Sequence, residues 1–108
     1  MSTDQSRVIE RRTQFAQRWL KRLEGTAARL TKSAQSSEDM KEITKDFHQI
    51  CGAAGIYELN ELCAVAIAAE DLCLTIAAAN SPPNSKQLEH LRSSVASIAK
   101  LLQPMSGA

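Results

Sequence analysis

A chain of 108 residues is long enough for one domain and too short for two. Hydrophobic residues make up 44% of it and aromatic residues only 4%, so a modest core can form, whereas a sheet, which favours aromatic and β-branched residues, is not expected. The formal net charge is +1 and the chain has one Trp, so neither a polyanionic partner nor a surface for stacking nucleic-acid bases is expected.

The first predicted element is a helix over about residues 5–32. Its apolar residues recur at spacings of three, four and seven, which places them on one side of a helix: Val8, Phe15, Trp19, Leu23, Ala27 and Leu30. The small polar segment 33–37 is typical of a loop, and Ser36 or Ser37 is expected to cap a second helix over about residues 38–54.

A third helix is predicted over about residues 59–79. It is apolar on nearly all sides, so it is expected to be the most buried helix of the molecule. Two prolines within the segment 80–84 end it. Ser85 is expected to cap a fourth helix over about residues 85–103, and the residues after Pro104 are expected to fray.

Short connections between successive helices favour antiparallel neighbours. The sequence therefore predicts an all-α fold, an antiparallel up-down-up-down four-helix bundle that forms a single domain over residues 1–108. Residues 1–32 carry eight Lys and Arg against three Asp and Glu, whereas residues 33–80 carry two against eight. We expect these opposite charges to compensate each other between packed neighbours.

The three cysteines, Cys51, Cys63 and Cys73, are odd in number and lie in apolar helical segments. The polar start of the chain has no apolar run of the signal-peptide kind, and no segment reaches the roughly 18 consecutive apolar residues of a membrane span. We therefore expect a cytoplasmic protein with no membrane partner, in which all three cysteines are reduced thiols.

The second helix carries the most informative pattern. At about 100° per residue, its apolar face holds Met40, Ile43, Phe47, Ile50, Cys51 and Ala54. His48 lies off that face, on a polar strip shared, within roughly 60°, by Lys41, Thr44, Lys45, Gly52 and Gly55.

A glycine in the middle of a helix costs about 1 kcal/mol relative to alanine. Gly52, one turn beyond His48, removes side-chain bulk and lets another surface approach the imidazole closely. Phosphoryl transfer between two proteins needs such access, because the nucleophile must enter the active site of the partner. A neutral imidazole is a suitable nucleophile, and Lys41 and Lys45 could stabilise the charge of the phosphate.

Helical spacing by itself is also compatible with simpler roles for these residues. A histidine on a helix surface is most often only solvated, Gly52 could serve a helix–helix contact, and Gly55 could be a helix C-terminal cap. Periodicity does not establish chemistry.

The stretch from Phe47 to Tyr57, Phe-His-Gln-Ile-Cys-Gly-Ala-Ala-Gly-Ile-Tyr, resembles the signature of the histidine phosphotransfer (HPt) domains of two-component phosphorelays. Those domains carry a His, an aliphatic residue two positions later, a Gly four positions later, and often another Gly. The chain then continues through Leu59–Leu62 to Glu70, which is similar to the family's next helix. The local match covers residues 44–72, and the four-helix layout extends it over the chain.

The resemblance implies that His48 accepts a phosphoryl group from the receiver domain of a hybrid sensor kinase and transfers it to the receiver aspartate of a response regulator. It also implies that Gly52 gives the partner access. Cys51 stands where many members of the family have Lys, so Lys45 or Gln49 is expected to steady the phosphate instead. Glu58 is a second departure, since some relatives have a small residue near that position.

We find no glycine-rich phosphate loop, so the chain is expected to have no ATP site and no autokinase activity. It is also expected to need no cofactor or metal of its own, because the magnesium ion would be bound by the receiver partner.

Three alternatives remain at the sequence level. The chain could be a non-catalytic helical adaptor that uses the His48 strip only for docking. It could be a small enzyme with His48 and Cys51 as a nucleophilic pair, although no third group orients them. A metal site built from the histidines and cysteines, with His90 included, is possible by residue type, but the spacings match no zinc-finger or zinc-ribbon pattern and the cysteines fall among core positions.

Overall fold

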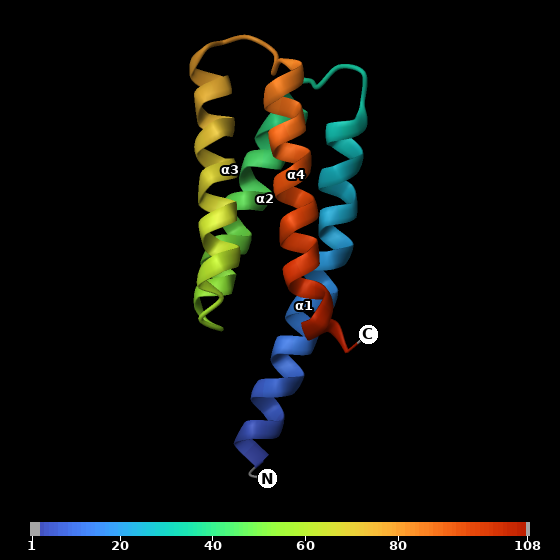
Figure 1. Cartoon of the computed structure of the whole chain (residues 1–108), viewed down its shortest axis with the longest axis vertical. Helices are drawn as coiled ribbons and strands as arrows, with labels where there is room; N and C mark the ends of the chain where they lie inside the picture. Colours follow the sequence, from blue (N-terminus) through green and yellow to red (C-terminus); the bar gives the residue numbers. More distant parts are fainter. Residues whose placement is uncertain (1–2, 108) are drawn as a thin grey trace.

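The computed structural model describes residues 3–107, with the side chains of residues 7–107. It consists of four α-helices and a short 3-10 helix: α1 (Thr3–Thr31), α2 (Ser37–Gly55), α3 (Asn60–Ala78), α4 (Ser85–Leu102) and η1 (Gln103–Ser106). Successive helices run in opposite directions (Figure 1). The predicted all-α, antiparallel up-down-up-down bundle is therefore confirmed. Met1, Ser2 and Ala108, which the predicted domain 1–108 includes, lie outside the described residues.

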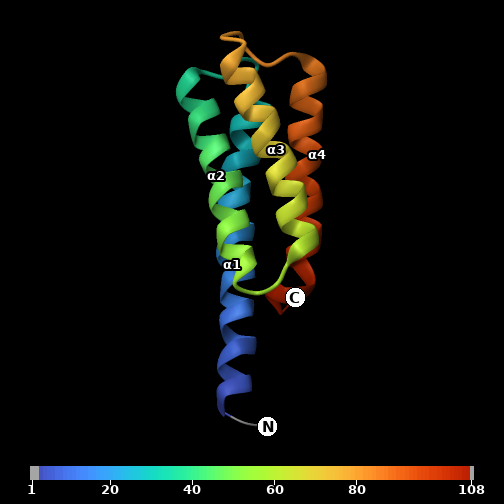
Figure 2. The same cartoon turned by 90° about the vertical axis from the view of Figure 1, so that its left-hand side faces the viewer.

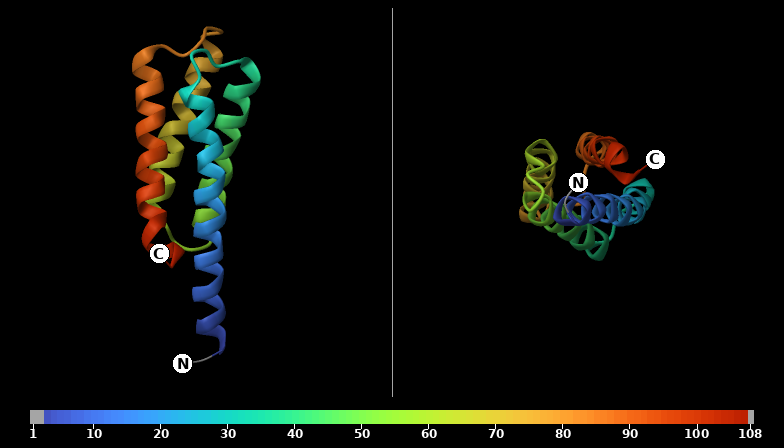
Figure 3. Two further views of the ribbon diagram at one scale, coloured as in Figure 1. Left: turned by 90° about the vertical axis from the view of Figure 1, so that its right-hand side faces the viewer. Right: turned by 90° about the horizontal axis from the view of Figure 1, so that it is seen from below.

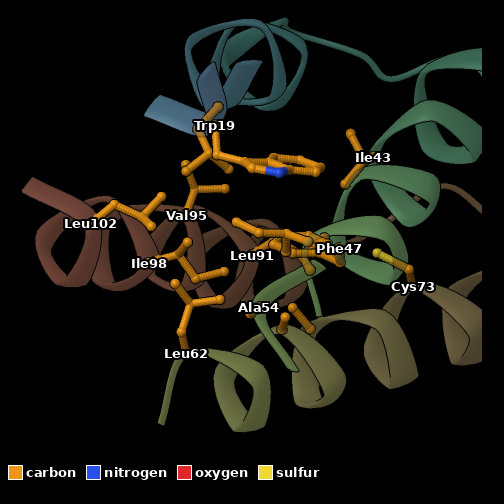
Figure 4. Close-up of a cluster of buried hydrophobic side chains, with 14 of the residues drawn as sticks. Trp19, Ile43, Phe47, Ala54, Leu62, Cys73, Leu91, Val95, Ile98 and Leu102 are labelled. Carbon is orange, nitrogen blue, oxygen red and sulfur yellow. The ribbon is translucent and has the colours of Figure 1, made fainter. Parts of the chain in front are cut away.

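The four helices pack around a shared interior, as the view from below in Figure 3 shows. The interior is filled by the apolar faces of all four helices, and Trp19 of α1, Phe47 of α2 and Leu91 of α4 meet near its middle (Figure 4). Most of the apolar stripe predicted for the first helix is buried in it, but Ala27 is only half-buried and Val8 is exposed.

The helix ends are fixed by local hydrogen bonds. Ser36 is the N-cap of α2: its hydroxyl accepts from the backbone N–H of Asp39, whose carboxylate accepts from the backbone N–H of Ser36 in return. Asn84 and Gln87 form the same reciprocal arrangement at the start of α4. The prediction that Ser85 caps α4 is wrong, because Asn84 has the extended backbone that a cap requires and Ser85 is the first helical residue.

The C-terminal segment is ordered where fraying was expected. Residues 103–106 form η1, and the carbonyl of Ser106 accepts a hydrogen bond of 2.9 Å from Gln17 of α1. The fraying prediction is thus wrong up to residue 107, and its last residue, Ala108, lies outside the described part of the chain.

The opposite charges of the first and middle thirds do meet between α1 and α2. Arg22 of α1 pairs with Asp46 of α2 at 3.0 Å, and Arg29 and Lys32 pair with Asp39 at 3.5 and 3.0 Å. These pairs join the two helices along one side of the bundle, which leaves the other side of α2 to face α3 (Figure 2).

Candidate functional site

His48 owes its position to the residue before it. Phe47 is completely buried between the helices and fixes the rotation of α2, with Ile43 and Ile50 buried one turn to either side. The next residue along the helix is turned by about 100°, so His48 points out of the core. Its side chain is 73% exposed.

Glu70 of α3 reaches this imidazole. Its Oε2 lies 2.7 Å from Nδ1 of His48, and its own side chain is only 21% exposed. A neutral imidazole carries one proton, and a carboxylate at Nδ1 holds that proton there. The other ring nitrogen, Nε2, then presents its lone pair to the solvent, which is the form required of a nucleophile.

Sequence reasoning did not name Glu70 as a site residue, although a signal for it was present. In an antiparallel helical hairpin, residues at equal distances from the turn face each other. His48 and Glu70 each lie eleven residues from Leu59, in the turn between α2 and α3.

Exposed apolar side chains flank Glu70 along α3. Ile67 is 46% exposed and Leu74 is 53% exposed, one turn before and one turn after Glu70. The prediction that the third helix is the most buried one is therefore wrong. Because α3 packs against α2 and α4 but not against α1, its outer face has no covering helix.

A hollow of about 630 Å³ lies between α2 and α3, and we call it the α2–α3 hollow. Its apolar lining includes Met40, Leu74 and Pro82, and His48 and Glu70 also line it. The polar residues of the predicted strip that line it are Lys41, Thr44 and Lys45. The structure thus gathers the cationic half of that strip beside His48.

The residues of the predicted strip differ in exposure and in the ion pairs and hydrogen bonds that they form. The side chains of Lys41 and Lys45 are exposed, and neither forms an ion pair with the described part of the chain. The hydroxyl of Thr44 donates to the carbonyl of Met40 at 2.6 Å, so it stays within its own helix.

Gln49 faces α1 rather than α3. Its side-chain oxygen Oε1 accepts a hydrogen bond from the guanidinium of Arg22. The Nε of Arg22 also donates to Asp46, at 3.0 Å. Asp46 is buried, and its other oxygen accepts from the hydroxyl of Thr26 at 2.7 Å. Sequence reasoning missed this polar cluster between α1 and α2, because the partners are far apart along the chain.

Gly52 and Gly55 are exposed, and a Cβ atom built on either would have no neighbouring atom within 4 Å. Gly52 therefore does not serve a helix–helix contact. Gly55 is not a left-handed helix cap, since the positive φ of this turn belongs to Glu58, at 57°. Both glycines leave open space one and two turns beyond His48.

Cys51 and Cys63 form a disulfide, with their Cα atoms 4.5 Å apart. The prediction of three thiols is therefore wrong for this pair. The two cysteines each lie six residues from Tyr57, so the α2–α3 hairpin brings them together, and such a contact is invisible in the periodicity of either helix alone. While this bond is intact, Cys51 cannot act as a nucleophile beside His48.

Cys73 is the buried free thiol of α3. Burial raises its pKa to about 11, so it remains protonated and chemically inert at neutral pH. Among the described side chains, those of residues 7–107, no group of three His, Cys, Asp or Glu is arranged to hold a metal ion. None of the helices within residues 3–107 is long and apolar enough to cross a membrane.

The comparison with protein families gives one match. The model of the family described as "Hpt domain" matches residues 11–101, which include all the residues of the site described above. Searches of curated proteins and of solved structures found no match. The matched range spans most of the chain, and the four-helix structure agrees with the helical bundles typical of that family. The chain therefore belongs to the Hpt domain family, whose members act in histidine phosphotransfer of two-component phosphorelays.

Proposed function

We propose that this protein is a phosphorelay carrier. His48 accepts a phosphoryl group from the receiver aspartate of a hybrid sensor kinase and transfers it to the receiver aspartate of a response regulator. The contact between Nδ1 of His48 and Glu70, at 2.7 Å on an exposed helix face, carries the proposal, because it leaves Nε2 as a free nucleophile.

In the accepting step, Nε2 attacks the phosphorus of the aspartyl phosphate in line with the bond to the carboxylate oxygen. The N–P bond forms as that P–O bond breaks, and the aspartate leaves with the electron pair. Because Nδ1 keeps its proton, the ring becomes cationic as the bond forms, and the carboxylate of Glu70 stabilises that charge. The donating step is the reverse reaction on a second receiver.

Lys45 and Lys41 are the cations that we propose to steady the phosphoryl group. Both are exposed residues of the α2–α3 hollow, and Lys45 lies one turn before His48. Gln49 remains a weaker candidate. Its side-chain oxygen is hydrogen-bonded to Arg22 of α1, so only the amide N–H groups of its side chain are left to donate to a phosphoryl group. Cys51 is not a candidate, because its sulfur is bonded to Cys63 in the structure and a reduced thiol is only a weak hydrogen-bond donor.

The receiver docks, in this proposal, on the outer face of α2 and α3. Ile67 and Leu74 give it an apolar contact on either side of Glu70, while Gly52 and Gly55 leave room for its close approach. The two lysines of the hollow suit the acidic phosphorylation pocket of a receiver.

We place this function in the cytoplasm and without nucleic-acid or membrane partners. In that compartment glutathione and thioredoxin keep most thiols reduced, so the Cys51–Cys63 pair would be present there largely as two thiols.

The test is phosphoryl transfer from a set of phosphorylated receiver domains to the purified protein. Wild type is expected to acquire an acid-labile, base-stable label, and His48→Gln none. His90→Gln is the matched control, since His90 is the other histidine, is exposed on α4, and should not affect labelling. A wild type that takes label from no receiver would refute the carrier proposal, and a labelled His48→Gln would refute the site.

A further inference from the structure

The first helix is longer than the bundle to which it belongs. From Thr3 it projects beyond the α2–α3 turn and beyond η1, as Figures 1 and 2 show. The side chains of residues 7–12 are all exposed, whereas Thr13 lies against Gly107 and Phe15 packs on Tyr57 with ring centroids 5.0 Å apart. We call residues 3–12 the N-terminal arm.

The apolar face by which α1 packs into the core continues along the arm, where no other helix of this chain covers it. Val8 and Ile9 are 52% and 54% exposed. They precede the buried Phe15 and Ala16 by seven residues, so each pair lies on one side of the helix. A helical arm of this length is only marginally stable when it is fully solvated, and an apolar stripe on it indicates a surface that packs against a partner.

The arm is also basic. Residues 3–12 carry Arg7, Arg11 and Arg12 against Asp4 and Glu10, so the arm has a net positive charge. The side chains of the three arginines and of Glu10 are exposed. Two such arms would repel each other, whereas an acidic surface with an apolar floor would match both the charge and the stripe.

Such a surface lies at the same end of the bundle. A hollow of about 330 Å³, which we call the acidic hollow, is formed by the start of α3 together with the end of α4 and η1. Glu58 and Glu61 line it and are exposed, and neither forms an ion pair with the described part of the chain. Its apolar lining is Leu59, Leu62, Leu101 and Met105.

We propose that the N-terminal arm of one copy docks in the acidic hollow of a second copy, and that the exchange is reciprocal, which gives a two-fold dimer. Val8 and Ile9 contact the apolar lining, and the arginines of the arm meet Glu58 and Glu61. The arm does not reach its own hollow, because it extends straight from α1 and no Gly or Pro occurs between residues 3 and 24 to break the helix.

The test is a charge exchange measured by sedimentation equilibrium over a range of protein concentrations. The arm-reversed variant is Arg7→Glu, Arg11→Glu, Arg12→Glu, and the hollow-reversed variant is Glu58→Arg, Glu61→Arg. All five residues are exposed, so both variants should fold, and circular dichroism checks this.

Wild type is expected to dimerise, and more weakly as salt is added. Each variant alone should dimerise at least about tenfold more weakly, since like charges then meet. An equimolar mixture of the two should form a 1:1 heterodimer of near wild-type affinity, because each acidic arm then meets a basic hollow and each basic arm an acidic one. Val8→Asp with Ile9→Asp should be monomeric.

The matched control reverses three exposed cations outside the arm, with Arg18→Glu, Lys21→Glu and Lys86→Glu, and should dimerise like wild type. A wild type that stays monomeric at low salt overturns the proposal, and so does a mixture that fails to restore the dimer. A hollow-reversed variant that dimerises normally would also overturn it, since the arms would then bind elsewhere. None of these measurements requires phosphoryl transfer, so they are independent of the proposed function.

Discussion

At the scale of single residues, the site depends on the contrast between His48 and its neighbours. Phe47 is fully buried, and that burial turns the imidazole outward into solvent. Glu70 then holds the proton of the neutral ring at Nδ1, whereas in a fully solvated histidine the proton can sit on either ring nitrogen. Exposure and a fixed tautomer together distinguish this histidine from a merely solvated one such as His90.

Glu70→Ala should slow phosphoryl transfer to His48 by about 10- to 100-fold, because a hydrogen bond to a charged group contributes roughly 1.5–3 kcal/mol. Glu70→Gln keeps an acceptor for the Nδ1 proton but no negative charge, so it should lie between wild type and Glu70→Ala. Initial rates of labelling by one phosphorylated receiver measure this. Equal rates for the three proteins would show that the contact has no role in transfer.

Gly52→Gln should change the stability of the fold and the rate of phosphoryl transfer in opposite directions. Since a Cβ at Gly52 meets no atom within 4 Å and glycine weakens a helix, the substitution should stabilise the fold by up to about 1 kcal/mol. The same side chain should block the receiver and reduce transfer at least about tenfold.

Urea unfolding and labelling rates measure the two effects of Gly52→Gln. Gly52→Ala should retain most transfer. Ala96→Gln, an exposed change on α4 and outside the proposed docking face of α2 and α3, should leave transfer unchanged. Normal transfer by Gly52→Gln would contradict the access role of this glycine.

At the scale of the element, α2 is held at its start by a charged cap. The backbone N–H of Ser36 and the ammonium of Lys32 lower the pKa of Asp39 from 3.8 to about 2. A carboxyl whose pKa is lower in the folded state contributes stability above its ordinary pKa and loses it as the pH falls towards the folded value. The helix that carries His48 should therefore loosen in acid.

The urea midpoint of wild type should fall between about pH 4 and pH 2 by more than that of Asp39→Asn, which has no charge to lose. The two proteins should differ at neutral pH and converge towards pH 2. Glu38→Gln, a change at an exposed acid in the same helical turn, is the control and should follow wild type. A constant difference between wild type and Asp39→Asn would refute the charged cap.

At the scale of the whole molecule, the bundle is tied across its α2–α3 turn by the Cys51–Cys63 disulfide, which encloses a short loop. A loop of this size restricts the unfolded chain enough to stabilise the fold by roughly 3 kcal/mol. Reduction should lower the free energy of unfolding by about that amount, measured by urea unfolding with and without dithiothreitol. Cys51→Ala with Cys63→Ala should be insensitive to the reductant, and an insensitive wild type would show that the bond does not stabilise the fold.

The sequence by itself determined the fold class and the position of the proposed phospho-acceptor. Helical spacing in the segments around Phe15, Phe47 and Leu91 was enough to predict α1, α2 and α4, because each of them hides one apolar face. The prediction of α3 came from a long apolar segment that ends at two prolines. Local spacing was also enough to place His48 outside the core with Gly52 beside it, since both facts depend on one helix only.

Only the tertiary structure decided which groups from other helices meet that histidine. Glu70, the Cys51–Cys63 bond, and the Arg22 contact that holds Gln49 all join residues of different helices, and their pairing depends on the register and rotation of packed helices. The exposure of Ile67 and Leu74 was decided in the same way, because an apolar helix is buried only on the sides where neighbours cover it. Periodicity describes one helix at a time, so it could place the nucleophile but not the groups that orient it.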